Sequence, residues 1–202
     1  MHSPEHLSGT IASLLATDAV TPATAKALNE RLQRQETTPR FFDAKKYHLL
    51  SVICDILMDQ SAENRLVPIA TFIDERLADG RSNGWRFDHL PPDPEMYSRG
   101  LQGIDETADI MFSQNLVSLA KHKQKAVLQA VQTGSAAGVI WERMSPVSFF
   151  EELLAEATEV FYAHPSTQEE INYHGMADAH GWSNIGLKET SEEVRMNNEG
   201  HA

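Results

Sequence analysis

The chain has 202 residues, a length that fits one domain with additional segments at its ends. Its 17 basic residues stand against 29 acidic ones, and the net charge of −12 argues against nucleic-acid binding and against an anionic membrane surface as partner. The one cysteine, Cys54, excludes an internal disulfide and a cysteine-based zinc site.

The sequence shows no sign of a membrane span or an export signal. It has no run of about 20 apolar residues, and its first 20 residues lack a charged region, a long apolar region and a twin-arginine pair. We therefore expect no membrane insertion and a cytoplasmic location. The alternative is the periplasm, reached together with a partner that carries the signal.

Helix signals dominate the first half of the chain. Thr21-Pro22 predicts a short helix over residues 22–35, within an N-terminal helical arm. Asp43 is expected to cap the next helix, whose apolar stripe includes Cys54. On that stripe the cysteine is interpreted as a small buried apolar side chain rather than a nucleophile, because no basic neighbour lies at helical spacing to lower its pKa.

Pro68 opens a third predicted helix, for which Gly80 is the natural stop. The stretch from residue 81 to 93 has too many Pro and Gly residues for a helix and too many large apolar ones for a flexible linker. We expect a packed functional loop there, followed by a helix that Asp93-Pro94 caps and opens.

The second half continues with two further predicted helices. One follows Ser118, with lysines in its first turns where a helix start favours acidic groups; either it begins earlier, or the lysines meet carboxylates. The small residues 134–138 are interpreted as a turn. Ser145-Pro146 opens the last strong helix, with apolar residues inside and glutamates outside, and Pro165 ends it.

These patterns predict an all-α protein with a single compact helical domain of about five to six helices and long packed loops. The predicted boundaries are an N-terminal arm over 1–38, the helical domain over 39–187 and an acidic tail over 188–202. No nucleotide-binding loop, hydrolase elbow or zinc-protease motif is present. A histidine-rich stretch near the C-terminus offers one alternative, a metal site formed by His164, His174, Asp178 and His180.

Four blocks then stand in one order along the chain: RFFDAKKYHLLSVICDILM, VPIATFIDERL, FFEELLAEATEVFYAHP and GMADAHGWSNIGL. Together they resemble the gluconate 2-dehydrogenase subunit 3 family, the small subunit of bacterial flavin-dependent sugar and sugar-acid dehydrogenases. The resemblance covers about residues 39–187.

The resemblance implies that a separate large subunit of the glucose–methanol–choline type holds FAD and oxidises the sugar, often with a cytochrome c as electron acceptor. The small chain would carry no catalytic residue and no cofactor, and would bind the large subunit for its maturation, stability or export. Many members begin with a twin-arginine signal that this chain lacks. Members without one look like partners of cytoplasmic enzymes, including those that oxidise the C3 hydroxyl of glycosides.

Two groups of residues are candidates for binding such a partner. The first group consists of large apolar residues in non-helical stretches, the types enriched in interface cores: Trp85, Phe87, Leu90, Tyr173, Met176, Trp182, Ile185 and Leu187. The competing interpretation is that these loops fold back over the domain's own core. The second group consists of Lys121, Lys123 and Lys125, which we expect to meet acidic groups of the C-terminal helix or of the large subunit.

Overall fold

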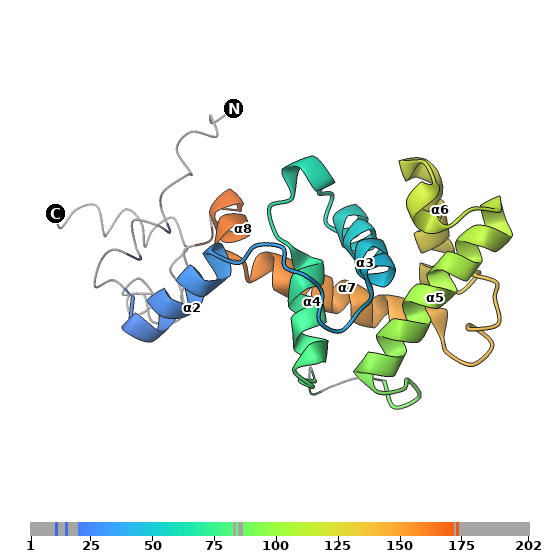
Figure 1. The fold of residues 1–202 in the computed structure, drawn as a ribbon, viewed down its shortest axis with the longest axis horizontal. Helices are drawn as coiled ribbons and strands as arrows, with labels where there is room; N and C mark the ends of the chain where they lie inside the picture. The colour runs from blue at the N-terminus through green and yellow to red at the C-terminus, as the bar shows by residue number, and fades with distance from the viewer. Residues whose placement is uncertain are drawn as a thin grey trace, which may run out of the picture. The chain divides into compact units, whose positions relative to one another are not determined.

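The computed structural model describes residues 11, 15, 20–82, 84, 87–171 and 173. Within these residues the chain forms seven α-helices and no strand, which confirms the all-α prediction (Figure 1). The α-helices are α2 (Pro22–Leu32), α3 (Ala44–Leu57), α4 (Ile69–Ala78), α5 (Asp93–Phe112), α6 (Lys121–Gln132), α7 (Pro146–Tyr162) and α8 (Pro165–Glu170). Two short 3₁₀ helices, η2 (Ala62–Asn64) and η3 (Leu116–Ser118), lie between them. None of the helices described is long and apolar enough to span a membrane.

The chain divides into two compact units. One comprises Met1–Arg34 with Tyr162–Ala202, and the other comprises Gln35–Phe161. We call them the terminal unit and the central unit. The arm was expected to end at residue 38, close to the boundary at 34. However, α8, which the sequence assigned to the main helical domain, packs against α2 in the terminal unit.

Local signals set most helix starts in the way the sequence indicates. Thr21 caps α2 by accepting the N–H of Thr24, and the Asp43 side chain caps α3 by accepting the N–H of Lys46 at 2.8 Å. Gly80, with a φ of 65°, follows α4 and ends it. The predicted turn over residues 134–138 lies between α6 and α7.

The start of α5 corrects one prediction. The N-cap position is Pro92, with no side-chain cap, and Asp93 is the first residue of the helix. The Asp93 carboxylate does not cap because it binds the guanidinium of Arg76 on α4 instead. A charged partner from another helix has therefore replaced the local hydrogen bond.

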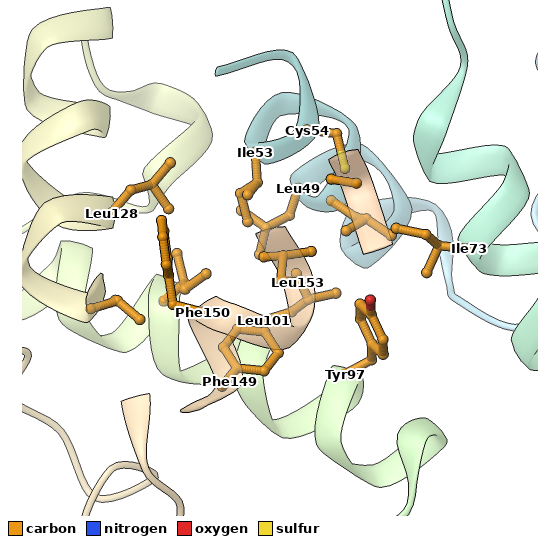
Figure 2. Packing of buried hydrophobic residues seen from close by; sticks show 14 of the residues in the cluster. Leu49, Ile53, Cys54, Ile73, Tyr97, Leu101, Leu128, Phe149, Phe150 and Leu153 are labelled. Carbon is orange, nitrogen blue, oxygen red and sulfur yellow. The ribbon is translucent and has the colours of Figure 1, made fainter. Parts of the chain in front are cut away.

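Apolar faces of α3 to α7 meet in the core of the central unit. Figure 2 shows ten of these side chains converging from the five helices, with the Cys54 thiol and the Tyr97 ring among them: Leu49, Ile53, Cys54, Ile73, Tyr97, Leu101, Leu128, Phe149, Phe150 and Leu153. Cys54 is buried, and burial raises the pKa of its thiol far above the ordinary value. The interpretation of this cysteine as a core residue is confirmed.

Two glycines allow α5 to approach its neighbours closely. A Cβ built on Gly100 would lie 2.1 Å from the Phe149 ring, and one on Gly103 would lie 2.5 Å from the Trp141 ring. Neither atom would fit without movement of an aromatic ring. The pair Gly100 and Gly103 thus lets two large rings pack directly on the helix backbone, while the Trp141 Nε1–H donates to Thr107 at 2.8 Å.

Candidate functional site

Arg76 on α4 lies at the centre of a buried ion-pair network. Its Nε and Nη2 donate to the Glu156 carboxylate of α7 at 2.5 and 2.8 Å, and its Nη1 donates to Asp93 of α5 at 2.7 Å. The Tyr97 hydroxyl of α5 donates to the same Glu156 carboxylate. Arg76 is 8% exposed and Glu156 5% exposed, so three helices are joined through charges held away from water.

The network keeps its guanidinium charged. Burial alone would lower the pKa of Arg76, but hydrogen bonds and charge from Glu156 and Asp93 outweigh burial and raise it. Burial and the neighbouring Glu156 charge raise the pKa of Tyr97 well above its ordinary value. Arg76 therefore stays charged and Tyr97 stays protonated near neutral pH. This suits a structural junction better than proton transfer.

The placement of Glu152 and Glu156 corrects the prediction that the glutamates of α7 lie outside. Both are buried, because Arg76 and the loop before α5 supply polar partners. The spacing could have indicated this for Glu156, which follows Phe149 by seven residues and Leu153 by three. That places its carboxylate on the same inward stripe.

The loop between α4 and α5 is held by hydrogen bonds to Arg76 and to α7. Arg76 also donates to the carbonyl of Arg81 at 2.8 Å, and the Phe87 N–H donates to Glu152 Oε1 at 3.3 Å. His89 Nε2 lies 2.9 Å from the Ser148 hydroxyl on α7. These contacts tie both ends of the loop to the central unit and confirm that it is packed.

The packed loop decides the position of two candidate interface residues. Leu90 is only 4% exposed and belongs to the core, and Phe87 is half-buried and packs against that core. For these two side chains the arrangement is the one that the competing interpretation predicts, because the loop folds back over apolar neighbours. Trp85 lies outside the described residues.

A further buried carboxylate, that of Asp74 on α4, holds the segment before α3. It accepts the backbone N–H groups of Arg40 at 2.6 Å, Phe41 at 3.1 Å and Phe42 at 2.9 Å. Such charge-assisted bonds are stronger than ordinary amide hydrogen bonds. They anchor the chain where it enters α3.

Another carboxylate, that of Asp55 near the end of α3, is held by Arg65. The guanidinium forms two hydrogen bonds to the carboxylate, at 2.8 and 2.6 Å, and a further ion pair to Glu36. The paired geometry fixes the connection between α3 and α4.

The three candidate lysines lie in the first turns of α6, which begins at Lys121 rather than before Ser118. Lys121 forms an ion pair with Asp59, 3.5 Å away, so the acidic partner follows α3 and is not on the C-terminal helix. Lys123 lies over the ring of Phe112, 5.1 Å from its centroid. Lys121 and Lys125 are exposed.

The C-terminal candidates are described only in part. Tyr173 is 43% exposed, as an interface residue would be, while Met176, Trp182, Ile185 and Leu187 lie outside the described residues. Large exposed apolar side chains that sequence reasoning missed are Ile110 and Met111 on α5 and Val139 before α7. Helical periodicity could not identify them, because exposed apolar residues follow no repeat.

Of the four residues of the alternative metal site, only His164 lies within the described structure. His164 is buried, and its two ring nitrogens bond the carbonyl of Arg31 and the N–H of Ser166. His174, Asp178 and His180 lie outside the described residues. Among the residues that the structure describes, no cluster of three or more metal-binding side chains occurs.

A family model described as gluconate 2-dehydrogenase subunit 3 matches residues 44–186. The chain belongs to this family. A search of curated proteins and a search of solved structures returned no match.

Three of the four blocks of the subunit 3 resemblance take part in these buried polar contacts, and the fourth lies outside the described residues. FIDER on α4 supplies Asp74 and Arg76, FFEELLAEATEV on α7 supplies Glu156, and the FF-D opening supplies the amide groups that Asp74 binds. In this chain the motif residues therefore join the helices of the central unit to one another. Their chemistry is that of a structural scaffold.

Proposed function

We propose that this chain is a non-catalytic small subunit that binds an FAD-dependent dehydrogenase of the glucose–methanol–choline type and stabilises or matures it. The substrate class is a sugar or glycoside, as for a glucoside 3-dehydrogenase or a gluconate 2-dehydrogenase. FAD belongs to the partner, which passes electrons to a cytochrome c or another acceptor. The observation that carries the proposal is the match of the subunit 3 family over residues 44–186.

The proposed place of action is the cytoplasm. The periplasm is the alternative, with transport beside a partner that bears the export signal. The net charge of −12 favours a protein partner over nucleic acid.

The buried charges support a binding role. Arg76, Asp93 and Glu156 are engaged with one another, and Asp74 is engaged with backbone amides. Buried ionic groups of this kind fix the relative position of helices at a cost in solvation, so they suit a protein that must present one well-defined surface. The partner would then bind a surface whose shape is already defined before binding.

The corner between α5 and α6 is the surface that fits the lysine hypothesis best. Met111 is 42% exposed, and the adjacent Phe112 lies under the ammonium group of Lys123. Lys121 and Lys125 are exposed one turn apart on the same helix. Exposed apolar and basic side chains together suit a partner patch of apolar and acidic residues. We assign the dehydrogenase subunit to this corner.

Co-expression with a flavoprotein of this type tests the proposal. With the small chain present, we expect the flavoprotein to be soluble, to contain FAD and to oxidise its sugar with a dye acceptor; without the chain, FAD content and activity should both fall. The small chain purified alone should be colourless and inactive. A flavoprotein that folds, binds FAD and turns over equally well without the small chain overturns the proposed function.

The triple variant Lys121→Gln, Lys123→Gln and Lys125→Gln tests the assigned corner. It should reduce co-purification of the flavoprotein while leaving the melting temperature of the isolated chain nearly unchanged. Asp59→Asn is the matched control, because it removes the ion pair to Lys121 but keeps every lysine. If Asp59→Asn lowers co-purification as much as the triple variant, the lysines act within the chain and the assignment of this corner is wrong.

A further inference from the structure

In the terminal unit α2 lies beside α8 (Figure 1), and Arg31 of α2 forms two hydrogen bonds to the segment between α7 and α8. The guanidinium of Arg31 donates to the carbonyl of Ala163 at 3.0 Å. The carbonyl of Arg31 in turn lies 3.0 Å from Nε2 of His164. Arg31 of α2 is thus bonded to two adjacent residues, Ala163 and His164.

The hydrogen bonds of His164 require one neutral tautomer. Its Nδ1 accepts the backbone N–H of Ser166 at 3.3 Å, as the cap of α8, so this nitrogen carries no proton. Its Nε2 therefore carries the proton and donates to the carbonyl of Arg31. The ring is 4% exposed, so water cannot replace either partner easily.

The bonds at His164 accompany a small apolar cluster. Val20 and Leu28 on the N-terminal side are buried together with Ile11, whose N–H donates to the Glu169 carboxylate of α8 at 2.9 Å. This cluster is separate from the core of the central unit. It is small, so a few hydrogen bonds decide whether the contact holds.

We propose that α2 is a pH-sensitive latch on α8, closed while His164 is neutral and released when its ring takes up a proton. A proton on Nδ1 would face the N–H of Ser166, so the cap of α8 would be lost and two donors would be placed against each other. The charged ring would also be buried away from water, because His164 is only 4% exposed.

The surroundings of His164 support the direction of the switch. On α2 the charged groups are Lys26 and Glu30, which pair with each other, and Arg31, whose charge opposes protonation of the ring. On α8 they are Glu169, engaged by the N–H of Ile11, and Glu170, which is exposed. Among the described residues none of these carboxylates forms a hydrogen bond or ion pair with the ring.

Burial lowers the pKa of His164, and this outweighs the opposite effect of the hydrogen bond to Arg31. Because the folded pKa is depressed, the latch is fully stable above the ordinary histidine pKa of about 6.5 and weakens as the pH falls below it. The latch loses stability until the pH reaches the lowered pKa of His164 in the folded chain.

The latch is independent of the proposed partner. Residues 44–186 match the family, so α8 lies inside the matched region whereas α2 lies outside it. Acidification would uncover the α8 face and the apolar side chains of α2 without requiring any change in the central unit.

Hydrogen exchange of the full chain, corrected for the intrinsic effect of pH, tests the latch. Between pH 7.5 and 5.5 we expect the opening of residues 20–34 and 163–171 to rise by up to about tenfold, the limit for a histidine that titrates only in the open state. Exchange in α3 should stay constant. His164→Gln should remove the pH response, while His122→Gln, an exposed histidine on α6, should retain it.

Equal pH responses of the native chain and His164→Gln would overturn the latch, as would parallel opening of α3. A second measurement covers the case in which His164→Gln disrupts the terminal unit. An NMR titration of the native chain should show the His164 ring as the Nε2–H tautomer with a pKa below the ordinary histidine value of about 6.5. A His164 ring that titrates at or above the ordinary value contradicts the proposal.

Discussion

The carboxylate of Asp74 on α4 accepts the backbone N–H of Phe42 at 2.9 Å, across 32 residues of chain. The N–H groups of Arg40 and Phe41 complete the same site, so one buried side chain holds three successive amides. The FID segment, inside the matched residues 44–186, and the FF-D segment, which directly precedes them, are therefore two halves of one structural contact. The contact fixes where α3 begins relative to α4.

Asp74→Asn should destabilise the central unit by about 1.5–3 kcal/mol, because the amide that replaces one oxygen would face the N–H of Arg40. Urea unfolding followed by circular dichroism measures the change. Asp79→Asn is the control, since Asp79 pairs with Arg40 at the surface, where an ion pair contributes little to stability. Equal losses of stability in the two variants would mean that the hydrogen bonds to the three amides do not cause the effect of Asp74→Asn.

Arg76→Met should cost about 3–5 kcal/mol of unfolding free energy, because Glu156 and Asp93 would be left buried without their cation. Arg76→Lys should recover part of the loss, since an ammonium group cannot form the paired contact to Glu156. Chemical denaturation gives both values. Arg99→Met, at an exposed pair with Glu95, should change stability by less than about 0.5 kcal/mol, and a loss there as large as at Arg76 would contradict this prediction.

Gly100→Ala and Gly103→Ala should each destabilise the protein by about 1–3 kcal/mol, because the new methyl group meets the Phe149 or Trp141 ring. Helix propensity alone predicts the opposite sign, a gain of about 1 kcal/mol for each substitution. Thermal unfolding decides between the two. A higher melting temperature in either variant would show that the ring moves aside at little cost.

Glu152→Gln should stabilise the protein at neutral pH and lose this advantage in acid. Burial raises the pKa of Glu152, so the unfolded chain releases its proton at lower pH than the folded one does. Stability is therefore lost as the pH rises from the ordinary value of about 4.3 through the raised one. The glutamine can still accept the N–H of Phe87 without a charge.

Melting temperatures of Glu152→Gln and the native chain between pH 3.5 and 7.5 measure this effect. Glu151→Gln, its exposed neighbour, should follow the native profile. A stabilisation by Glu152→Gln that is the same at every pH would have another cause.

Thr167→Val should stabilise the terminal unit by about 1 kcal/mol. The Thr167 hydroxyl is buried on α8 and has no hydrogen-bond partner in the described part of the chain, whereas valine has nearly the same shape and no polar group to desolvate. Exchange of the α8 amides reports the change. Thr167→Ser, which keeps the hydroxyl and loses a methyl group, should move stability in the opposite direction, and stabilisation by serine instead would show that the hydroxyl has a partner.

Helix positions could be predicted because their signals are local. The Asp43 cap, the Pro68 start and the Gly80 stop each depend on residues within one turn. The family could also be predicted, because four short blocks occur in one order. All of these features can be recognised without knowing which helices pack against one another.

The buried charges could not be predicted in the same way. Arg76 and Glu156 are 80 residues apart in the sequence, and the local pattern around either residue does not indicate its partner. The spacing places Glu156 on the inward stripe of α7 but does not indicate its partner, and Glu152 resembles the solvated face until the loop before α5 is in place. Asp93 likewise has the sequence pattern of a helix cap, and only the presence of Arg76 explains why it does not act as one.

The pairing of α2 with α8 has a consequence for the order in which the protein forms during synthesis. Arg31 and its partner Ala163 are separated by 132 residues, so α2 leaves the ribosome long before α8 exists. At ordinary translation rates this interval is on the order of ten seconds, and the central unit up to Phe161 is itself synthesised during it. The helix α2 is therefore made well before its partner α8, and its apolar side depends on other protection until α8 has been made.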